Sequence, residues 1–353
     1  MKKLLILLLV IAMTATTLVG CAKPAPTPAP APAPTTPEPA KEVALEPLHL
    51  VIAHNQTSTD NPYQYGMLEF KKVVEEISAG NITVEVHNGS IGTNESELIE
   101  KLSLGAADMV VASPGFMTGI GVKEVDILSL LYLFNSFDHW EKALDGEFGT
   151  QMKDIITEKT SNEFKVMSYF SSGVRNFYGK KPLNVPTDAA GLKIRTQNSP
   201  VQQQFWKDAG AIPSSVDWNE LYQGLQQGVV DAAENDYTNF MQKDHHKTAN
   251  GKYISETEHD YTTRLLLMNG ERFDALPQQQ QDWITEAVEK ATAEERAVVY
   301  KMLDESKAKV IADGGIVNEV DLDAFRALAT PIQDKYAKDN NMVELLEAVR
   351  AIK

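Results

Sequence analysis

The chain of 353 residues has one cysteine, Cys21, so it cannot form an internal disulfide and its fold must rest on a packed core. Positive charge is also in short supply, because 33 Lys and Arg stand against 49 Asp and Glu, a formal net charge of −16. This acidic balance argues against a nucleic-acid partner and against electrostatic binding to anionic lipid. Only one long apolar run occurs, Leu4–Met13, and it is too short to cross a bilayer.

Catalytic and phosphate-binding motifs are missing as well. The patterns G-x-S-x-G, G-x-x-x-x-G-K-[ST] and H-E-x-x-H do not occur. Gly119-Ile120-Gly121 begins like a dinucleotide fingerprint, but Glu124 stands at the position of the third glycine. His245 and His246 are adjacent and would point to different sides of a helix, so we expect them on the surface rather than on a metal. The sequence therefore predicts a protein that is not an enzyme and has neither a cofactor nor a metal site.

The first 45 residues have the pattern of a targeting segment. Lys2 and Lys3 precede the apolar run, and Leu18-Val19-Gly20-Cys21 follows it and resembles a bacterial lipobox. We therefore expect residues 1–20 to be a lipoprotein signal peptide and Cys21 to carry the lipid. Residues 21–45 are rich in Ala-Pro pairs and predict an extended tether. The protein should then be extracytoplasmic and anchored to a bacterial membrane by its N-terminal lipid.

The remaining residues alternate between strand and helix patterns, which predicts an α/β fold with a largely parallel sheet. Two expected helices begin at capping boxes, one at Asn94 with Glu97 and one at Asp217 with Glu220. The expected strands are 48–53, 82–86, 108–112, 164–169, 191–195, 229–233 and 263–268, and the expected helices include 67–77, 94–105, 217–228, 277–313 and 322–338.

The pattern restarts after the first group of strands, which predicts two α/β lobes that close like a clamp around a hinge. Lobe I is expected to contain residues 46–172 and about 261–300, and lobe II residues 173–260 and about 301–353. The helix that starts at Pro277 is long enough to span both lobes. Ligands of such sheets lie beyond the carboxyl ends of the strands, so a ligand cleft is expected between the lobes.

Arginine is scarce, and none occurs before Arg175. Its planar guanidinium can hold a carboxylate through two parallel hydrogen bonds. Arg195 ends the predicted strand 191–195 and so faces the side where a ligand is expected. Arg175 follows Ser171-Ser172-Gly173-Val174, and Arg264 lies inside an apolar run and is a weaker candidate. These residues favour a binding site for an organic acid.

Two long motifs extend this interpretation. Residues 186–195 read PTDAAGLKIR, and residues 220–235 read ELYQGLQQGVVDAAEN. Both resemble signatures of the solute receptors of tripartite ATP-independent periplasmic (TRAP) transporters, and the resemblance covers about residues 48–340. It implies a periplasmic-binding-protein-like clamp that delivers a small organic acid to the small and large membrane subunits of a permease. The acid is left open among dicarboxylates, sugar acids, keto acids and aromatic acids, and we expect a monomer.

The resemblance also implies roles for single residues. Arg195 would bind the ligand carboxylate, Asn235 would help to hold it, and Arg175 would add a second charged contact. Four further positions match polar or aromatic ligand contacts: Asn198, Trp218, Asn55 and Glu95.

The sequence departs from the family pattern at two informative positions. Asp236 stands where proline is common, and we expect it to loosen the turn after Asn235. Ser113 stands where sialic-acid-binding members carry a glutamate, which argues against sialic acid. Phe177, Tyr178 and Phe116 are candidates for an apolar wall or for core packing.

Three other functions stay open from the sequence. The chain could be a binding lipoprotein that serves a sensor kinase or another type of transporter, because the same clamp suits both. A secreted enzyme acting on a sugar acid and a purely structural surface protein are the remaining alternatives.

Overall fold

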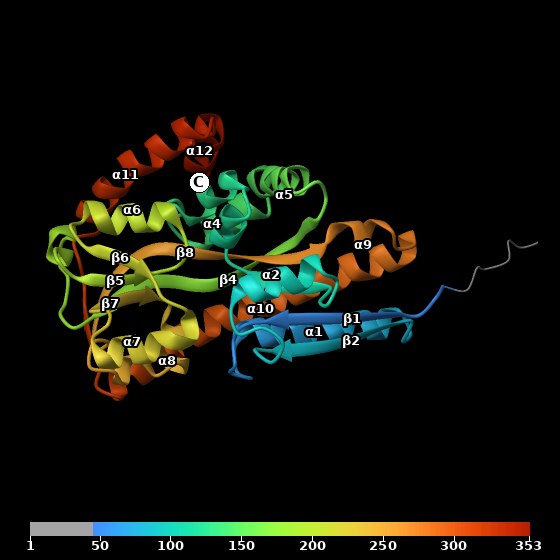
Figure 1. The fold of residues 1–353 in the computed structure, drawn as a ribbon, viewed down its shortest axis with the longest axis horizontal. Helices are drawn as coiled ribbons and strands as arrows, with labels where there is room; N and C mark the ends of the chain where they lie inside the picture. Colours follow the sequence, from blue (N-terminus) through green and yellow to red (C-terminus); the bar gives the residue numbers. More distant parts are fainter. Residues whose placement is uncertain (1–44) are drawn as a thin grey trace, which may run out of the picture. The chain divides into compact units, whose positions relative to one another are not determined.

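The computed structural model describes residues 45–353, so the predictions for the signal peptide, for lipidation of Cys21 and for the tether lie outside the described residues. Residues 45–353 fold as one compact unit around a nine-stranded sheet (Figure 1). Along the sheet the strands follow the order β2-β1-β3-β8-β4-β7-β5-β6, and β9 pairs with β8. The strands are β1 Leu48–His54, β2 Ile82–Asn88, β3 Met109–Ala112, β4 Phe164–Gly179, β5 Lys193–Thr196, β6 Ile212–Ser215, β7 Ala232–Asn235, β8 Tyr253–Asn269 and β9 Ile316–Asn318.

The sheet is parallel toward its two edges and antiparallel in its centre. β1 pairs in parallel with β2 and β3, and β5 pairs in parallel with β6 and β7. Between these groups lie β4 and β8, of 16 and 17 residues, which pair antiparallel with each other and with β7 and β3, respectively. The expected parallel sheet is therefore found as two groups, and the two central strands that join them were predicted only in part, as 164–169 and 263–268.

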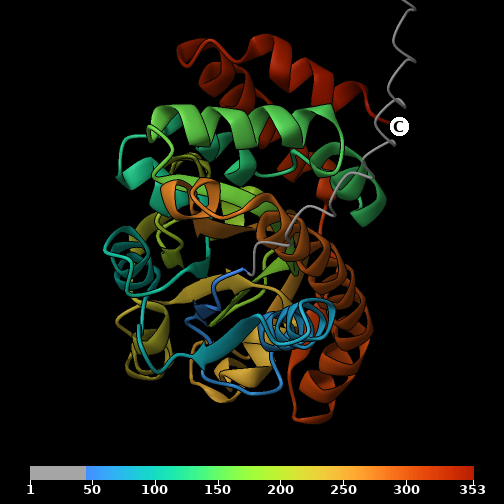
Figure 2. The same ribbon diagram turned by 90° about the vertical axis from the view of Figure 1, so that its right-hand side faces the viewer.

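Helices cover both faces of this sheet (Figure 1). They are α1 Pro62–Ile77, α2 Glu95–Ser103, α3 Pro114–Gly119, α4 Phe137–Leu144, α5 Glu147–Lys159, α6 Pro200–Asp208, α7 Leu221–Gln227, α8 Tyr237–Gln242, α9 Gly270–Asp274, α10 Gln278–Ala312, α11 Leu322–Asp339 and α12 Val343–Ala351. The predicted long helix is confirmed as α10, whose 35 residues span about 52 Å at 1.5 Å each. It packs along α1 and reaches α8 (Figure 2). No helix within residues 45–353 has the length and apolar character needed to cross a membrane.

Alternate residues of a strand pack into separate hydrophobic cores on the two faces of the sheet. In β3, Met109 and Val111 join one apolar cluster, while Val110 and Ala112 join another on the opposite face. The same alternation recurs at the other end of the sheet, where neighbouring residues of β4 and of β7 enter different clusters. Both parallel groups are thus covered on both faces, which holds their carboxyl ends in place.

One predicted helix cap is confirmed and the other is wrong. The Asn94 side chain accepts a hydrogen bond from the Glu97 amide at 2.9 Å, as expected for the start of α2. Asp217 makes no such bond, because the chain first forms a 3₁₀ turn over Trp218–Glu220 in which the Asp217 carbonyl accepts from the Glu220 amide. The Asp217 carboxylate is therefore left without a capping role.

The expectation that His245 and His246 lie on the surface is wrong, since they are 0% and 6% exposed. Each ring lies within hydrogen-bond distance of a residue that is far away in the sequence. His245 Nδ1 lies 2.8 Å from the Tyr178 hydroxyl, and His246 Nε2 lies 3.1 Å from an Asp313 carboxylate oxygen. Burial first, and then the nearby Arg195, lowers the pKa of His245 to about 3, so its ring is neutral.

Candidate functional site

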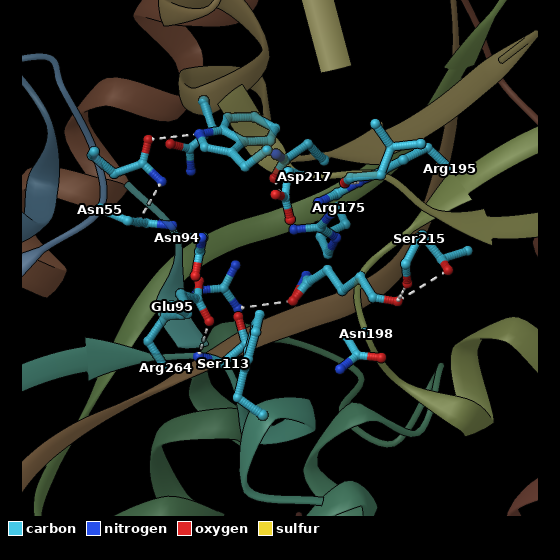
Figure 3. A pocket seen from close by; sticks show the side chains of 18 residues that line it. Asn55, Asn94, Glu95, Ser113, Arg175, Arg195, Asn198, Ser215, Asp217 and Arg264 are labelled. Carbon is cyan, nitrogen blue, oxygen red and sulfur yellow. Dashed lines mark hydrogen bonds between the residues drawn. The ribbon is translucent and has the colours of Figure 1, made fainter. Parts of the chain in front are cut away.

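A cavity of about 110 Å³ lies beyond the carboxyl ends of the strands, and it has room for several water molecules or for a small solute (Figure 3). The structure brings all seven predicted ligand-binding residues to its wall, although these residues lie far apart in the sequence. The lining residues are Asn55, Gln56, Asn94, Glu95, Ser113, Phe116, Arg175, Arg195, Thr196, Gln197, Asn198, Ser215, Val216, Asp217, Trp218, Asn235, Asn239 and Arg264.

The position of the cavity follows from the strand topology. Asn55 comes directly after β1, and Ser113 comes directly after β3. From the other parallel group, Arg195 lies near the end of β5 and Asn235 is the last residue of β7. In parallel α/β sheets the carboxyl ends of the strands form the ligand-binding edge, and here the edges of both groups face one cavity.

Arg175 lies in this wall, but each of its three side-chain nitrogens already donates a hydrogen bond to the protein. It is 1% exposed and forms an ion pair through Nε with the carboxylate of Glu234. Nη2 donates to the Glu234 carbonyl at 2.6 Å, and Nη1 donates to Asn235 Oδ1 at 2.8 Å. Burial by itself would raise the pKa of Glu234, but Arg175 and His259 hold it well below the usual range. Arg175 is therefore a charged support for its neighbour.

Asn235 has its side-chain amide oriented by these contacts. Its Oδ1 accepts from Arg175 and also from the Asp236 amide at 2.9 Å. Because both lone-pair directions of Oδ1 are used, the Nδ2 group is the part of the amide left to donate toward the cavity. A fixed N–H donor at this place suits an anionic oxygen.

Arg195 has the opposite arrangement to Arg175. Its Nε donates to the Val216 carbonyl at 2.9 Å, but its two terminal nitrogens make no hydrogen bond or ion pair to residues 45–353. The residue is 7% exposed, so little water reaches this charge. Burial lowers the pKa of Arg195, and the Glu234 carboxylate, which is paired with Arg175, offsets this only in part. An anion of the right shape would compensate the buried guanidinium.

Trp218 connects the two sides of the cavity. Its indole N–H donates to Gln56 Oε1 at 3.0 Å, and the Arg195 guanidinium lies 5.8 Å from the centre of its ring. The Trp218 ring also packs edge-on against the His245 ring, with 5.1 Å between the ring centres. These contacts fix the position of the Trp218 ring, whose aromatic face suits the apolar face of a bound solute.

Polar groups complete the wall near α2 and α3. Glu95 Oε2 accepts from the Ser113 amide at 2.6 Å, which leaves Oε1 as an acceptor. Asn55 Oδ1 accepts from Gln56 Nε2, which leaves the Asn55 amide as a donor. Asn198 makes no side-chain hydrogen bond to residues 45–353, and its backbone carbonyl lies so close to Gly115 that an added Cβ would sit 2.1 Å from it. The two sides of the cavity meet at this glycine.

The structure also corrects the expectation for Asp236 and adds residues that the sequence did not single out. Asp236 does not loosen the turn after Asn235, because its side chain caps α8 by accepting from the Asn239 amide at 2.9 Å. Asp217 and Gln56 line the cavity without having been predicted, and Arg264 lies there as the weaker candidate of the three arginines. Asp217 was marked only as an expected helix cap, and no local motif marks Gln56.

The proposed apolar wall is only partly found. Phe116 lines the cavity, whereas Phe177 and Tyr178 are buried in the apolar clusters on opposite faces of the sheet. Because neighbouring residues of a strand point to opposite faces of the sheet, each ring packs in one of the two cores.

Comparison with known proteins gives a consistent answer. Residues 52–339 match the profile of the bacterial extracellular solute-binding protein family 7, DctP. A solute-binding protein of Chromohalobacter salexigens is 32% identical over 279 residues, which are 78% of this chain and 81% of that protein.

Two solved structures are similar over nearly their whole length. A TRAP periplasmic solute-binding protein of Sulfitobacter sp. NAS-14.1, with bound β-D-galacturonate, has 30% identity and a TM-score of 0.79 and covers 86% of this chain and 99% of its own. One from Chromohalobacter salexigens, with bound D-glucuronate, has 29% identity, a TM-score of 0.80, and covers 86% and 100%, respectively. The matched range contains the cavity-lining residues and both sequence motifs. This chain is a member of the bacterial extracellular solute-binding protein family 7 and a solute receptor of the TRAP type.

Proposed function

We propose that this receptor binds a small sugar acid whose carboxylate pairs with Arg195, and that it passes the acid to a TRAP permease without transforming it. The observation that carries the proposal is the pair of terminal nitrogens on Arg195, which lie buried in the cavity wall and have no hydrogen-bond partner within residues 45–353. A carboxylate would accept two parallel, charge-assisted hydrogen bonds from them. The Nδ2 group of Asn235 would add a third donor.

The rest of the wall suits hydroxyl groups better than a second carboxylate. Glu95 and Asp217 both line the cavity, and within residues 45–353 neither Glu95 Oε1 nor the Asp217 carboxylate accepts a hydrogen bond. A carboxylate accepts hydrogen bonds from hydroxyl groups but repels another anion. Asn55 and Asn198 add amide groups that can pair with hydroxyls. The galacturonate and glucuronate held by two structural relatives are acids of this kind.

The proposed mechanism is closure of two lobes, lobe I from residues 46–172 and about 261–300, and lobe II from the remainder of 46–353. Contacts that would have to break on opening support it. Trp218 donates to Gln56, and Asn219 Nδ2 donates to the Thr93 carbonyl at 2.6 Å. These bonds join the proposed lobes directly over the cavity. An acid favours closure to the extent that it binds the closed form more tightly than the open one.

The proposed partners are the small and large membrane subunits of the permease, and the proposed anchor is a lipid on Cys21. We propose that the receptor acts as a monomer outside the cytoplasm. Two measurements address these points. Exchange of Cys21→Ser should release the protein from the membrane fraction into the soluble extracytoplasmic fraction. Deletion of the adjacent permease genes should abolish uptake of the labelled acid while leaving its binding unchanged.

Ligand binding can be tested with the chain from residue 21 carrying Cys21→Ser. Its thermal unfolding would be measured with D-galacturonate, D-glucuronate, succinate and neutral D-galactose. Binding to the native state alone stabilises by about 2.7 kcal/mol at a ligand concentration of 100 times Kd. We expect the two uronates to raise Tm more than succinate does, and D-galactose to have no effect. A rise with D-galactose and none with any acid would show that the carboxylate is not what the receptor recognises.

A further inference from the structure

A chain of buried hydrogen bonds runs from the cavity arginine Arg264 to the carboxylate of Asp236. Arg264 Nε donates to the Tyr63 hydroxyl at 3.0 Å, and that hydroxyl donates to Ser172 Oγ at 3.0 Å. Ser172 Oγ in turn donates to Asp236 Oδ2 at 3.2 Å. All four residues are buried, so each bond is made away from bulk water. The Tyr63 hydroxyl accepts from Arg264 and donates to Ser172, and the Ser172 hydroxyl donates its one proton to Asp236, so the chain has a single direction and ends on the Asp236 carboxyl group.

The far end of this chain is firmly fixed. Asp236 is 0% exposed, and its Oδ1 caps α8 by accepting from the Asn239 amide at 2.9 Å. The Asn239 side chain donates to both Asp236 Oδ2, at 2.7 Å, and Ser172 Oγ, at 3.0 Å. Burial raises the pKa of Tyr63 to about 12, although the Arg264 charge and the hydrogen bond to Ser172 act in the opposite direction, so its hydroxyl stays protonated and able to donate. Hydrogen bonds in such a series polarise one another.

The near end faces the cavity. Arg264 Nη1 donates to the Thr263 carbonyl at 3.1 Å, and Nη2 makes no hydrogen bond or ion pair to residues 45–353. With Nε and Nη1 both held, the guanidinium plane is set and Nη2 is the donor that remains. Unlike Arg175, whose charge is paired with Glu234, Arg264 has no carboxylate within ion-pair distance in the described part of the chain.

From this arrangement we propose that Arg264 is a second ligand-binding cation beside Arg195, and that Tyr63, Ser172 and Asp236 are positioning residues that orient it. The ligand class that takes two such cations is an acid with a further oxygen acceptor beside its carboxylate. The proposal rests on the proposed function, because it concerns the same cavity.

The relay also crosses the proposed division between the lobes, since Tyr63 lies on α1 and Asp236 lies between β7 and α8. Arg264 is thus oriented fully only when these two segments are together. A ligand that binds Arg264 would therefore favour the arrangement in which the relay is intact.

A double-mutant cycle tests the proposal on the chain from residue 21 with Cys21→Ser. The dissociation constant of D-galacturonate, and of succinate in a parallel series, would be measured calorimetrically for wild type, Tyr63→Phe, Arg264→Met and the double variant. Methionine keeps much of the packing volume of the arginine stem, and Phe removes only one hydroxyl. The matched control is Tyr65→Phe, which removes a hydroxyl on the same helix that bonds to Asp60 outside the relay.

We expect Arg264→Met to weaken binding about 10- to 100-fold and Tyr63→Phe about 3- to 10-fold, as for loss of a charge-assisted and of an indirect hydrogen bond. In the Arg264→Met background, Tyr63→Phe should change Kd less than about twofold, because the group it orients is gone. Tyr65→Phe should have no effect. The thermal midpoint without ligand identifies any variant that is merely unfolded. In that case Asp236→Asn, which changes the other end of the relay, replaces Tyr63→Phe, and the same loss of affinity for the acid is expected.

Three outcomes would overturn the proposal. If Arg264→Met binds like wild type, Arg264 is not a ligand contact. If Tyr63→Phe weakens binding equally in both backgrounds, its role is structural and separate from Arg264. If neither acid binds wild type, the proposed function fails and this proposal fails with it. If Arg195→Ala loses binding but the effects of Tyr63→Phe and Arg264→Met simply add, only the relay is refuted.

Discussion

Replacement of Arg195 by alanine separates ligand binding from folding, because binding should be largely lost while the stability of the unliganded fold changes little. The variant removes the guanidinium whose terminal nitrogens have no partner within residues 45–353. If a ligand carboxylate pairs with them, the bound acid would lose two charge-assisted hydrogen bonds and keep its own charge buried without a partner. Loss of one partner of a buried ion pair costs about 3–5 kcal/mol, which is roughly a few hundred-fold or more in Kd.

The unliganded protein should not be weakened in the same way. Burial already lowers the pKa of Arg195, which means that the fold carries its charge at a cost. Within residues 45–353 the one hydrogen bond lost is that from Nε to the Val216 carbonyl, about 1 kcal/mol, beside the contact of the guanidinium with the Trp218 ring. We therefore expect the Tm without ligand to fall by a few degrees at most, or to rise.

The assay is calorimetric titration with D-galacturonate, beside thermal unfolding without ligand. Arg326→Ala is the matched control, since Arg326 is an exposed arginine paired with exposed Asp323 and should leave Kd unchanged. An Arg195→Ala variant that binds the acid within about threefold of wild type would refute the carboxylate pairing. A variant that loses binding only because it is unfolded at the assay temperature would refute the claim that this charge is costly to the fold.

Three further predictions follow from buried contacts. Arg175→Met should destabilise the fold by about 3–5 kcal/mol in chemical denaturation, because Glu234 is left charged and unpaired, and Arg175→Met with Glu234→Gln should recover part of that loss. Glu295 is buried on α10, and burial raises its pKa to about 8 although the Ser171 amide donates a hydrogen bond to it. The folded state therefore favours the protonated carboxyl group. The stability that this proton contributes is fully present below about pH 4.5 and is lost as the pH rises through 8. Glu295→Gln should thus be more stable than wild type at pH 8, by a few kcal/mol at most, and equal to it near pH 4; equal stabilities at both pH values would contradict this. Gly115→Ala should weaken ligand binding at least about tenfold with little loss of Tm, because a Cβ would sit 2.1 Å from the Asn198 carbonyl and keep the cavity walls apart, and unchanged binding in calorimetry would contradict it.

The sequence predicted the ligand-facing strand ends well because their signals are local. Arg195 closes an apolar strand, and Asn235 ends a long motif, so each could be placed without knowing the fold. The central strands were underestimated for the opposite reason. Only the apolar parts of β4 and β8 were predicted, because their polar halves, such as Ser171–Arg175, read as loops. These halves are strands because they pair with each other over the full length of the sheet, which is a tertiary effect.

Partners that are distant in the sequence explain the other misses. Tyr63 has nothing in its neighbourhood that points to Arg264, which is 201 residues away. His245 was expected on the surface because adjacent histidines look polar, but a hydroxyl from β4 satisfies its ring inside the core. Asp236 looked like a weakened turn, and its role appears only when the start of α8 is seen beside Ser172. For Tyr63 and His245 the decisive hydrogen-bond partner comes from a distant element, whereas Asp236 combines a local cap from Asn239 with a distant bond from Ser172.

The different charge environments of Arg175 and Arg195 bear on how the receptor would distinguish acids from neutral sugars. Arg175 is neutralised by Glu234 and cannot discriminate between solutes, because its charge is already satisfied. Arg195 remains buried and uncompensated, so closure around a neutral sugar would leave that charge without water and without an anion. Closure around an acid supplies the missing partner. Selectivity would then arise from the cost of enclosing the wrong solute as much as from attraction to the right one. On this reasoning D-galactose should fail to stabilise the protein even though it carries most of the hydroxyl groups of D-galacturonate, and Arg195→Met should bind D-galactose no worse than wild type does.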